Sequence, residues 1–163
     1  MSRSEETPAV TRSEFLRLAA LGAGGLGLTA LAGCNTTKTI VEGSRPGAVV
    51  VITNGEKDSS RAILGLICAT KLPKGDNHVW FVLDGVPLLK KGEAEKVTSP
   101  IFAKLGTAAK LLDEIKAQGA ALHACPVCAE FFGVKGDARI DGVDEKGGDW
   151  LMEMATSHNM AWF

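Results

Sequence analysis

Short apolar runs alternate with amphipathic segments along most of the chain. Val and Ile dominate residues 48–53, and further apolar runs cover 79–83, 120–124 and 160–163. Continuous apolar runs of this length are typical of strands buried on both faces of a parallel sheet. The pattern therefore predicts four strands, with a weaker fifth strand around 139–143.

Helical spacing of apolar residues separates these strands. Capping residues near Asp58 precede apolar positions that recur every three or four residues up to Pro73. The clearest amphipathic pattern covers 101–118 and ends at Gly119. Shorter helices are expected at 129–133 and from Trp150, with a charged, mobile loop at 92–100. Strands alternating with helices indicate an α/β layer fold with a mainly parallel sheet.

The N-terminal segment has the pattern of a bacterial export signal. A polar start is followed by an apolar run at 18–32 that is too short and too rich in Gly to span a bilayer comfortably. The run ends in Leu31-Ala32-Gly33-Cys34, which resembles the lipobox whose cysteine is acylated after the chain is cut before it. An uncleaved membrane anchor is the alternative. The predicted organisation is a signal peptide at 1–33, a lipid-anchored linker at 34–47 and one domain at 48–163.

The export route is not fixed by this segment. Residues 11–17 resemble the twin-arginine export motif, but Ser13 stands where the second Arg belongs. Both the twin-arginine and the general secretory route therefore stay open. Either route delivers the protein across the inner membrane, so we expect a lipoprotein on the periplasmic side of a membrane.

Composition narrows the classes of partner and cofactor. The 163 residues suffice for one domain, and 18 Lys and Arg against 19 Asp and Glu leave a net charge of −1, which gives no basic surface for nucleic acid. Gly22, Gly24 and Gly27 match the spacing of a dinucleotide-binding motif. They lie inside the export signal, without the preceding strand that such a motif needs, so no cofactor is expected.

The most informative chemistry lies in Cys125-Pro126-Val127-Cys128, between a predicted strand and a predicted helix. A thiol at the start of a helix faces unpaired backbone N–H groups and the positive end of the helix dipole, which stabilise a thiolate. Reactive groups of parallel sheets also gather at the carboxyl ends of strands. His123 would share a strand face with Cys125 and stabilise its thiolate. The candidate catalytic residues are Cys125, Cys128 and His123.

Two other functions of this pair are compatible with the sequence. Cys-Pro-x-Cys resembles glutaredoxin-type sites, so thiol–disulfide exchange is an alternative that an exported protein tolerates. The C-x-x-C spacing also occurs in zinc sites, but a second pair of ligands is absent unless His158 is recruited, so no metal is expected. A lipid-anchored binding subunit without sulfur chemistry is a further alternative.

The domain as a whole resembles the DsrE/DsrF-like family of sulfur-relay proteins. The matching features are the Val-rich first strand, Leu83-Asp84-Gly85-Val86 after the second strand, Gly119-Ala120-Ala121-Leu122 before the cysteines, and a terminal strand ending in Phe163. The resemblance implies a three-layer α/β/α fold of about five strands that assembles into trimers or hexamers. It also implies a sulfurtransferase-like role, in which Cys125 carries persulfide sulfur between donor and acceptor proteins.

Overall fold

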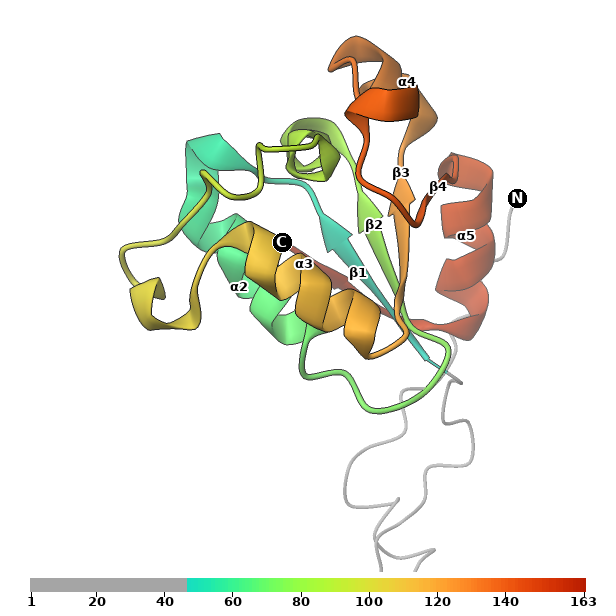
Figure 1. Cartoon of the computed structure of the whole chain (residues 1–163). Coiled ribbons are helices and arrows are strands. Elements are labelled where there is room, and N and C mark those ends of the chain that lie inside the picture. The colour runs from blue at the N-terminus through green and yellow to red at the C-terminus, as the bar shows by residue number, and fades with distance from the viewer. Residues whose placement is uncertain (1–46) are drawn as a thin grey trace, which may run out of the picture. The chain divides into compact units, whose positions relative to one another are not determined.

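A five-stranded, all-parallel sheet forms the centre of residues 47–163, the part of the chain that the computed structural model describes (Figure 1). The predicted signal peptide and the lipid site Cys34 lie outside the described residues. The strand order is β4-β3-β2-β1-β5. The strands are β1 (Ala48–Ile52), β2 (His78–Phe81), β3 (Ala121–Ala124), β4 (Val143–Glu145) and β5 (Asn159–Trp162).

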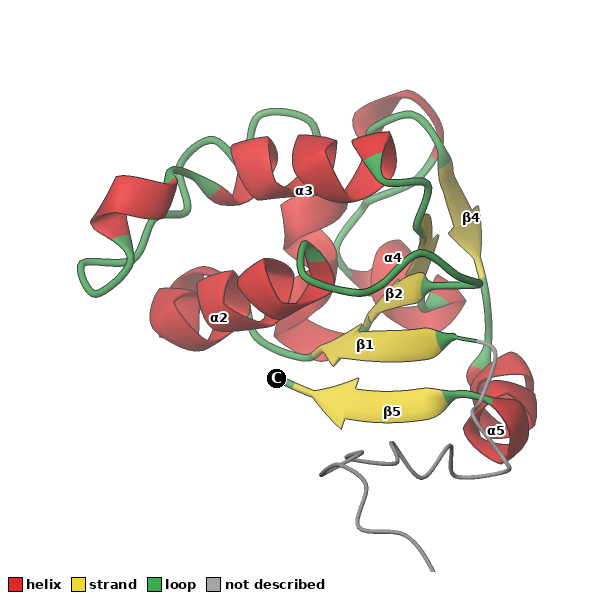
Figure 2. Ribbon diagram, turned by 90° about the horizontal axis from the view of Figure 1, so that it is seen from below, coloured by secondary structure: helices red, strands yellow, loops and turns green. Residues whose placement is uncertain are grey.

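Helices on both faces of the sheet complete three layers, as the resemblance implied. α2 (Ser59–Ala69) and α3 (Ala108–Ala117) cover one face, and α5 (Gly148–Ser157) lies against the other (Figures 1 and 2). α4 (Pro126–Phe131) follows β3 at the carboxyl end of the sheet. The 3-10 turns are η1 (Glu56–Asp58), η2 (Leu83–Leu89), η3 (Ala103–Leu105) and η4 (Gly136–Ala138).

Burial of β1 on both faces of the sheet explains why its sequence is apolar at every position. Val50 and Ile52 belong to the large core under α2 and α3, whereas Val49 and Val51 belong to a second cluster under α5. All four are almost completely buried. Burial of each side chain contributes about 1.5–3 kcal/mol, so both layers depend on this strand.

The prediction of a helix over 101–118 is wrong for residues 101–107. α3 begins only at Ala108, because Gly106 adopts a φ of 101° that ends the short η3 turn. The Thr107 hydroxyl then accepts a hydrogen bond from the Lys110 N–H at 3.3 Å and caps the new helix. The amphipathic pattern was correct for the second part, whose apolar face packs in the core.

Two further expectations for the irregular segments need correction. The weak strand expected at 139–143 is β4 at Val143–Glu145, because Gly142, with a φ of 75°, turns the chain just before it. The stretch 92–100, expected to be a mobile loop, forms turns whose Ala94 and Val97 are buried in the main core. No helix between residues 47 and 163 is long and apolar enough to cross a membrane.

Candidate functional site

The sheet and α4 together fix the position of Cys125. Its N–H donates to the Phe81 carbonyl at 2.9 Å, which extends the pairing of β3 with β2 by one residue. Its carbonyl accepts the first helical hydrogen bond of α4, from Ala129 at 2.8 Å. Pro126 follows at the first helical position, where a missing N–H costs nothing. Both predicted elements are therefore present, although the helix covers Pro126–Phe131 and not 129–133, and Cys125 is the residue that joins them.

The Cys125 side chain does not cap α4, contrary to the sequence-based expectation. It packs instead against the apolar cluster under α5, which includes Trp80 and Leu151. The backbone N–H group that reaches sulfur is that of Leu83, which donates to Cys128 Sγ at 3.3 Å. The stabilising donor thus comes from the loop after β2, and it serves the second cysteine.

Cys128 is a half-buried thiol on the first turn of α4 and packs against the core under α2 and α3. Burial raises the pKa of Cys128, and the neighbouring Cys125 side chain raises it further, whereas the Leu83 N–H lowers it. The net pKa lies above its ordinary value. Because the thiolate is the nucleophile, the raised pKa leaves a smaller fraction of Cys128 in the reactive form at neutral pH than of a cysteine with an ordinary pKa.

Leu83 holds its N–H toward Cys128 in a conformation that is uncommon for its residue type. Its φ of 52° makes it the only residue other than glycine with a positive φ between residues 47 and 163. A left-handed conformation costs a side chain with a Cβ roughly 1–2 kcal/mol. Such strained residues gather at functional sites, and this one lies beside the two thiols.

Leu83→Gly is expected to be more stable than Leu83→Ala by about 1 kcal/mol, because only glycine adopts this conformation without strain. Both changes remove the same exposed side chain, so the comparison isolates the backbone term. Urea unfolding of the two variants measures the difference. Equal free energies of unfolding would show that Leu83 is not strained.

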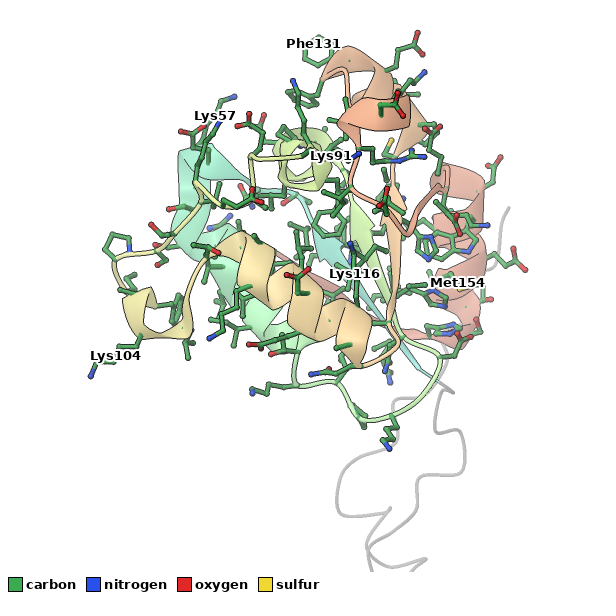
Figure 3. All side chains as sticks on the ribbon, viewed as in Figure 1. Lys57, Lys91, Lys104, Lys116, Phe131 and Met154 are labelled. Atoms are coloured by element: carbon green, nitrogen blue, oxygen red, sulfur yellow. The ribbon has the colours of Figure 1, made fainter. Side chains whose placement is uncertain are left out.

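Exposed apolar side chains border the cysteines. Leu83, Val127 and Phe131 are 59%, 75% and 81% exposed, respectively. α4 packs against η2, and Phe131 projects from the outer end of α4 (Figure 3). Exposed apolar patches of this kind mark surfaces at which proteins associate.

His123 lies on β3 as expected, but its hydrogen bond leads away from the cysteines. The ring is only 3% exposed, and its Nε2 lies 3.0 Å from Nδ1 of His78 on β2. Burial lowers the pKa of His123 to about 4, and the charge of His78 lowers it as well. His123 is therefore neutral at neutral pH and offers Cys125 no positive charge.

The sequence located both cysteines of the candidate site but not the Leu83 N–H beside Cys128. The Cys125–Cys128 spacing is local, so the pair could be located without a fold. The role of Leu83 depends on a backbone hydrogen bond across 45 residues. The segment Leu83-Asp84-Gly85-Val86, one of the features of the family resemblance, pointed toward this loop but not toward that hydrogen bond.

Comparison with curated proteins gives a relative that is itself uncharacterised. No family model matches the chain. The uncharacterised protein MJ0760 of Methanocaldococcus jannaschii is 28% identical over 82 residues. The match covers 50% of this chain but 29% of MJ0760, so this chain spans less than a third of that relative.

Two solved structures share the architecture of the domain. The ychN protein from E. coli has a TM-score of 0.54 and 20% identity, over 72% of this chain and 99% of ychN. MTH1491 from Methanobacterium thermoautotrophicum, a protein of unknown function, has a TM-score of 0.53 and 16% identity, over 71% of this chain and 97% of its own. Both belong to the DsrE/DsrF-like fold family. The domain of this chain therefore has a DsrE/DsrF-like α/β fold.

Proposed function

We propose that the protein is a sulfur carrier that accepts sulfane sulfur on Cys125 and passes it to a partner thiol. The observation that carries the proposal is the placement of Cys125. It is a free, half-buried thiol at the carboxyl end of β3, held by β2 and α4 in a DsrE/DsrF-like fold. Parallel α/β sheets concentrate reactive groups at this edge.

The transfer is balanced without an external oxidant. The Cys125 thiolate attacks the outer sulfur of a donor persulfide, the donor S–S bond breaks, and its electron pair leaves with the donor thiolate. Cys125 then carries a persulfide. A partner thiolate attacks the outer sulfur, and Cys125 leaves as a thiolate again. Each step exchanges one S–S bond for another.

Cys128 determines how long the carried sulfur persists. Its thiolate can attack the inner sulfur of the Cys125 persulfide, which releases hydrosulfide and forms a Cys125–Cys128 disulfide. The raised pKa of Cys128 slows this reaction, which supports sulfur carriage over rapid discharge. The Cys125 side chain is nevertheless a direct neighbour of Cys128. That proximity favours thiol–disulfide exchange as the second candidate function.

The surroundings of the thiols support a protein partner. The apolar side chains of Leu83, Val127 and Phe131 offer a docking surface from which a partner cysteine reaches Cys125. Self-association into trimers or hexamers is part of the proposal. It is supported by β5, whose outer edge is a sheet edge and whose Trp162 is exposed.

Intact mass spectrometry tests the function directly. The reduced protein is exposed to a small-molecule persulfide, and the cysteine peptides are then mapped. One added sulfur on Cys125 supports the sulfur carrier. A Cys125–Cys128 disulfide without retained sulfur, together with no added sulfur on Cys125 in the Cys128→Ser variant, supports thiol–disulfide exchange and overturns the first proposal.

Export and lipid anchoring complete the proposal, with Cys34 as the acylated residue. Cys34→Ala is expected to move the protein from the membrane fraction to the soluble fraction of a bacterial host, because the thioether-linked lipid is lost. Fractionation and immunoblotting measure this, with Cys68→Ala as the matched control that keeps the lipobox. Unchanged membrane retention of Cys34→Ala would favour an uncleaved anchor.

A further inference from the structure

The three histidines of the chain are far apart in sequence but adjacent in the fold, and two of them lie at the end of the sheet opposite the cysteines. His78 begins β2, and His158 directly precedes β5, so both lie at the amino ends of strands. The ring of His78 is 5.2 Å from that of His123 and 5.4 Å from that of His158, between centroids. The proposed sulfur chemistry uses none of these contacts.

An aspartate joins two of the histidines in a geometry that suits a metal ion. Asp76 Oδ1 lies 3.1 Å from His78 Nε2, and Asp76 Oδ2 lies 3.3 Å from His158 Nε2. One ligand atom from each residue can be chosen so that all lie within 4.8 Å of one another. Ligands at about 2.0–2.1 Å from a tetrahedral zinc ion are about 3.3 Å apart, so the three ligand atoms, which lie within 4.8 Å of one another, would move closer together on binding.

The second nitrogen of each imidazole has a hydrogen-bond partner, as metal-binding histidines usually do. His78 Nδ1 lies 3.0 Å from His123 Nε2, and His158 Nδ1 lies 2.9 Å from the Ser157 hydroxyl. Such outer contacts orient the ring, and a proton on Nδ1 would turn the lone pair of Nε2 toward the metal. Both imidazoles are thus held with Nε2 toward Asp76.

His123 contacts Nδ1 of His78, the ring nitrogen that does not contact Asp76. The Nδ1 of His123 is the one buried side-chain nitrogen or oxygen without a hydrogen-bond partner among residues 47–163. This nitrogen lies on the other side of the ring from the contact with His78, so it adds no ligand to the cluster. If His78 Nε2 binds a metal, His78 Nδ1–H donates to His123 Nε2, so His123 serves as an outer partner of the metal ligand.

The burial pattern leaves one side of the cluster open. His158 is 3% exposed. The Trp150 ring contacts His78 edge-on, with 5.4 Å between ring centroids, and helps to shield that imidazole from solvent. The Asp76 side chain is 63% exposed. We propose that Asp76, His78 and His158 bind a divalent transition-metal ion, with His123 as the outer partner of His78.

The ligand set of two imidazoles and one carboxylate indicates which class of metal ion would bind. Imidazole nitrogen suits zinc and its neighbours in the first transition row, whereas calcium and magnesium prefer oxygen alone. Three protein ligands leave a coordination position open on the solvent side. Zinc is the expected ion, and cobalt(II) is its spectroscopic probe.

The test uses the full chain in detergent, without a polyhistidine tag. Its four cysteines are replaced (Cys34→Ser, Cys68→Ala, Cys125→Ser and Cys128→Ser), so that no thiolate competes for metal. We expect visible d–d absorption on addition of cobalt(II), without a sulfur-to-cobalt charge-transfer band, and its loss on addition of zinc. Absence of d–d absorption in this protein, with its circular dichroism unchanged, would overturn the proposal.

Single changes in the same background locate the site. Asp76→Asn and His158→Asn should weaken cobalt binding by at least about 100-fold, and His123→Asn by about 10- to 100-fold. Asp113→Asn, an exposed aspartate on the opposite helical layer, is the matched control and should bind like the parent. Because Asp76 is exposed, its variant keeps the fold. Parent-like cobalt affinity in Asp76→Asn would refute this site.

Discussion

Cys125→Ser is expected to abolish sulfur uptake from a persulfide donor, whereas Cys128→Ser keeps it and prolongs the life of the loaded form. A serine hydroxyl does not become an anion at neutral pH and cannot displace a thiolate from sulfur, so no S–S bond forms at position 125. In Cys128→Ser, the nucleophile that would discharge the persulfide internally is gone. Mass spectrometry of the loaded proteins over time measures both effects.

The control for this experiment is Cys68→Ala, which removes a cysteine in α2, away from the C-x-x-C pair. It should load one sulfur like the parent. Equal loading of Cys125→Ser and the parent would exclude Cys125 as the carrier. Faster loss of sulfur from Cys128→Ser than from the parent would contradict the role assigned to Cys128.

Gly85→Ala is expected to lower the free energy of unfolding by about 3 kcal/mol, or roughly 10 °C in Tm. A Cβ at this position would lie 2.3 Å from the Ile52 carbonyl oxygen and 2.9 Å from the carbonyl carbon. Both atoms belong to the backbone at the end of buried β1, so a side-chain rotation cannot relieve the clash. Either β1 or the turn of η2 must shift.

The same shift would alter the thiol site, because η2 also carries Leu83. We therefore expect Gly85→Ala to change the reactivity of Cys128 as well as stability. Gly148→Ala is the matched control, since a Cβ there meets nothing within 4 Å and its φ is ordinary. It should leave stability unchanged or raise it by up to about 1 kcal/mol. A parent-like Tm for Gly85→Ala would show that this packing is loose.

The two sites lie at opposite ends of the parallel strands, and this separation follows from the direction of the chain. Every strand points its carboxyl end toward the end of the sheet where the Leu83 N–H meets Cys128. The amino ends of β2 and β5 bring His78 and the residue before β5, His158, to the other edge. Failure of the sulfur tests at Cys125 would therefore leave the metal proposal untouched, and the reverse also holds.

The sequence alone determined the fold class and the position of the thiols. Strands such as β1 are apolar at every position because they are buried on both faces, and that pattern is visible in the sequence. The Cys125–Cys128 pair is local, so its place after a strand was correct as well. Helix and strand limits at Gly106 and Gly142 were missed, because a positive φ depends on how the chain turns onto its neighbours.

Only the tertiary structure decided which groups surround the cysteines and which residues meet elsewhere. The Leu83 N–H reaches Cys128 from 45 residues away, and Asp76 meets His158 across 82 residues. The spacing of apolar residues does not predict such contacts, because they depend on the order in which the parallel strands pair in the sheet. Local patterns determine secondary structure and burial, whereas strand order determines which side chains become neighbours.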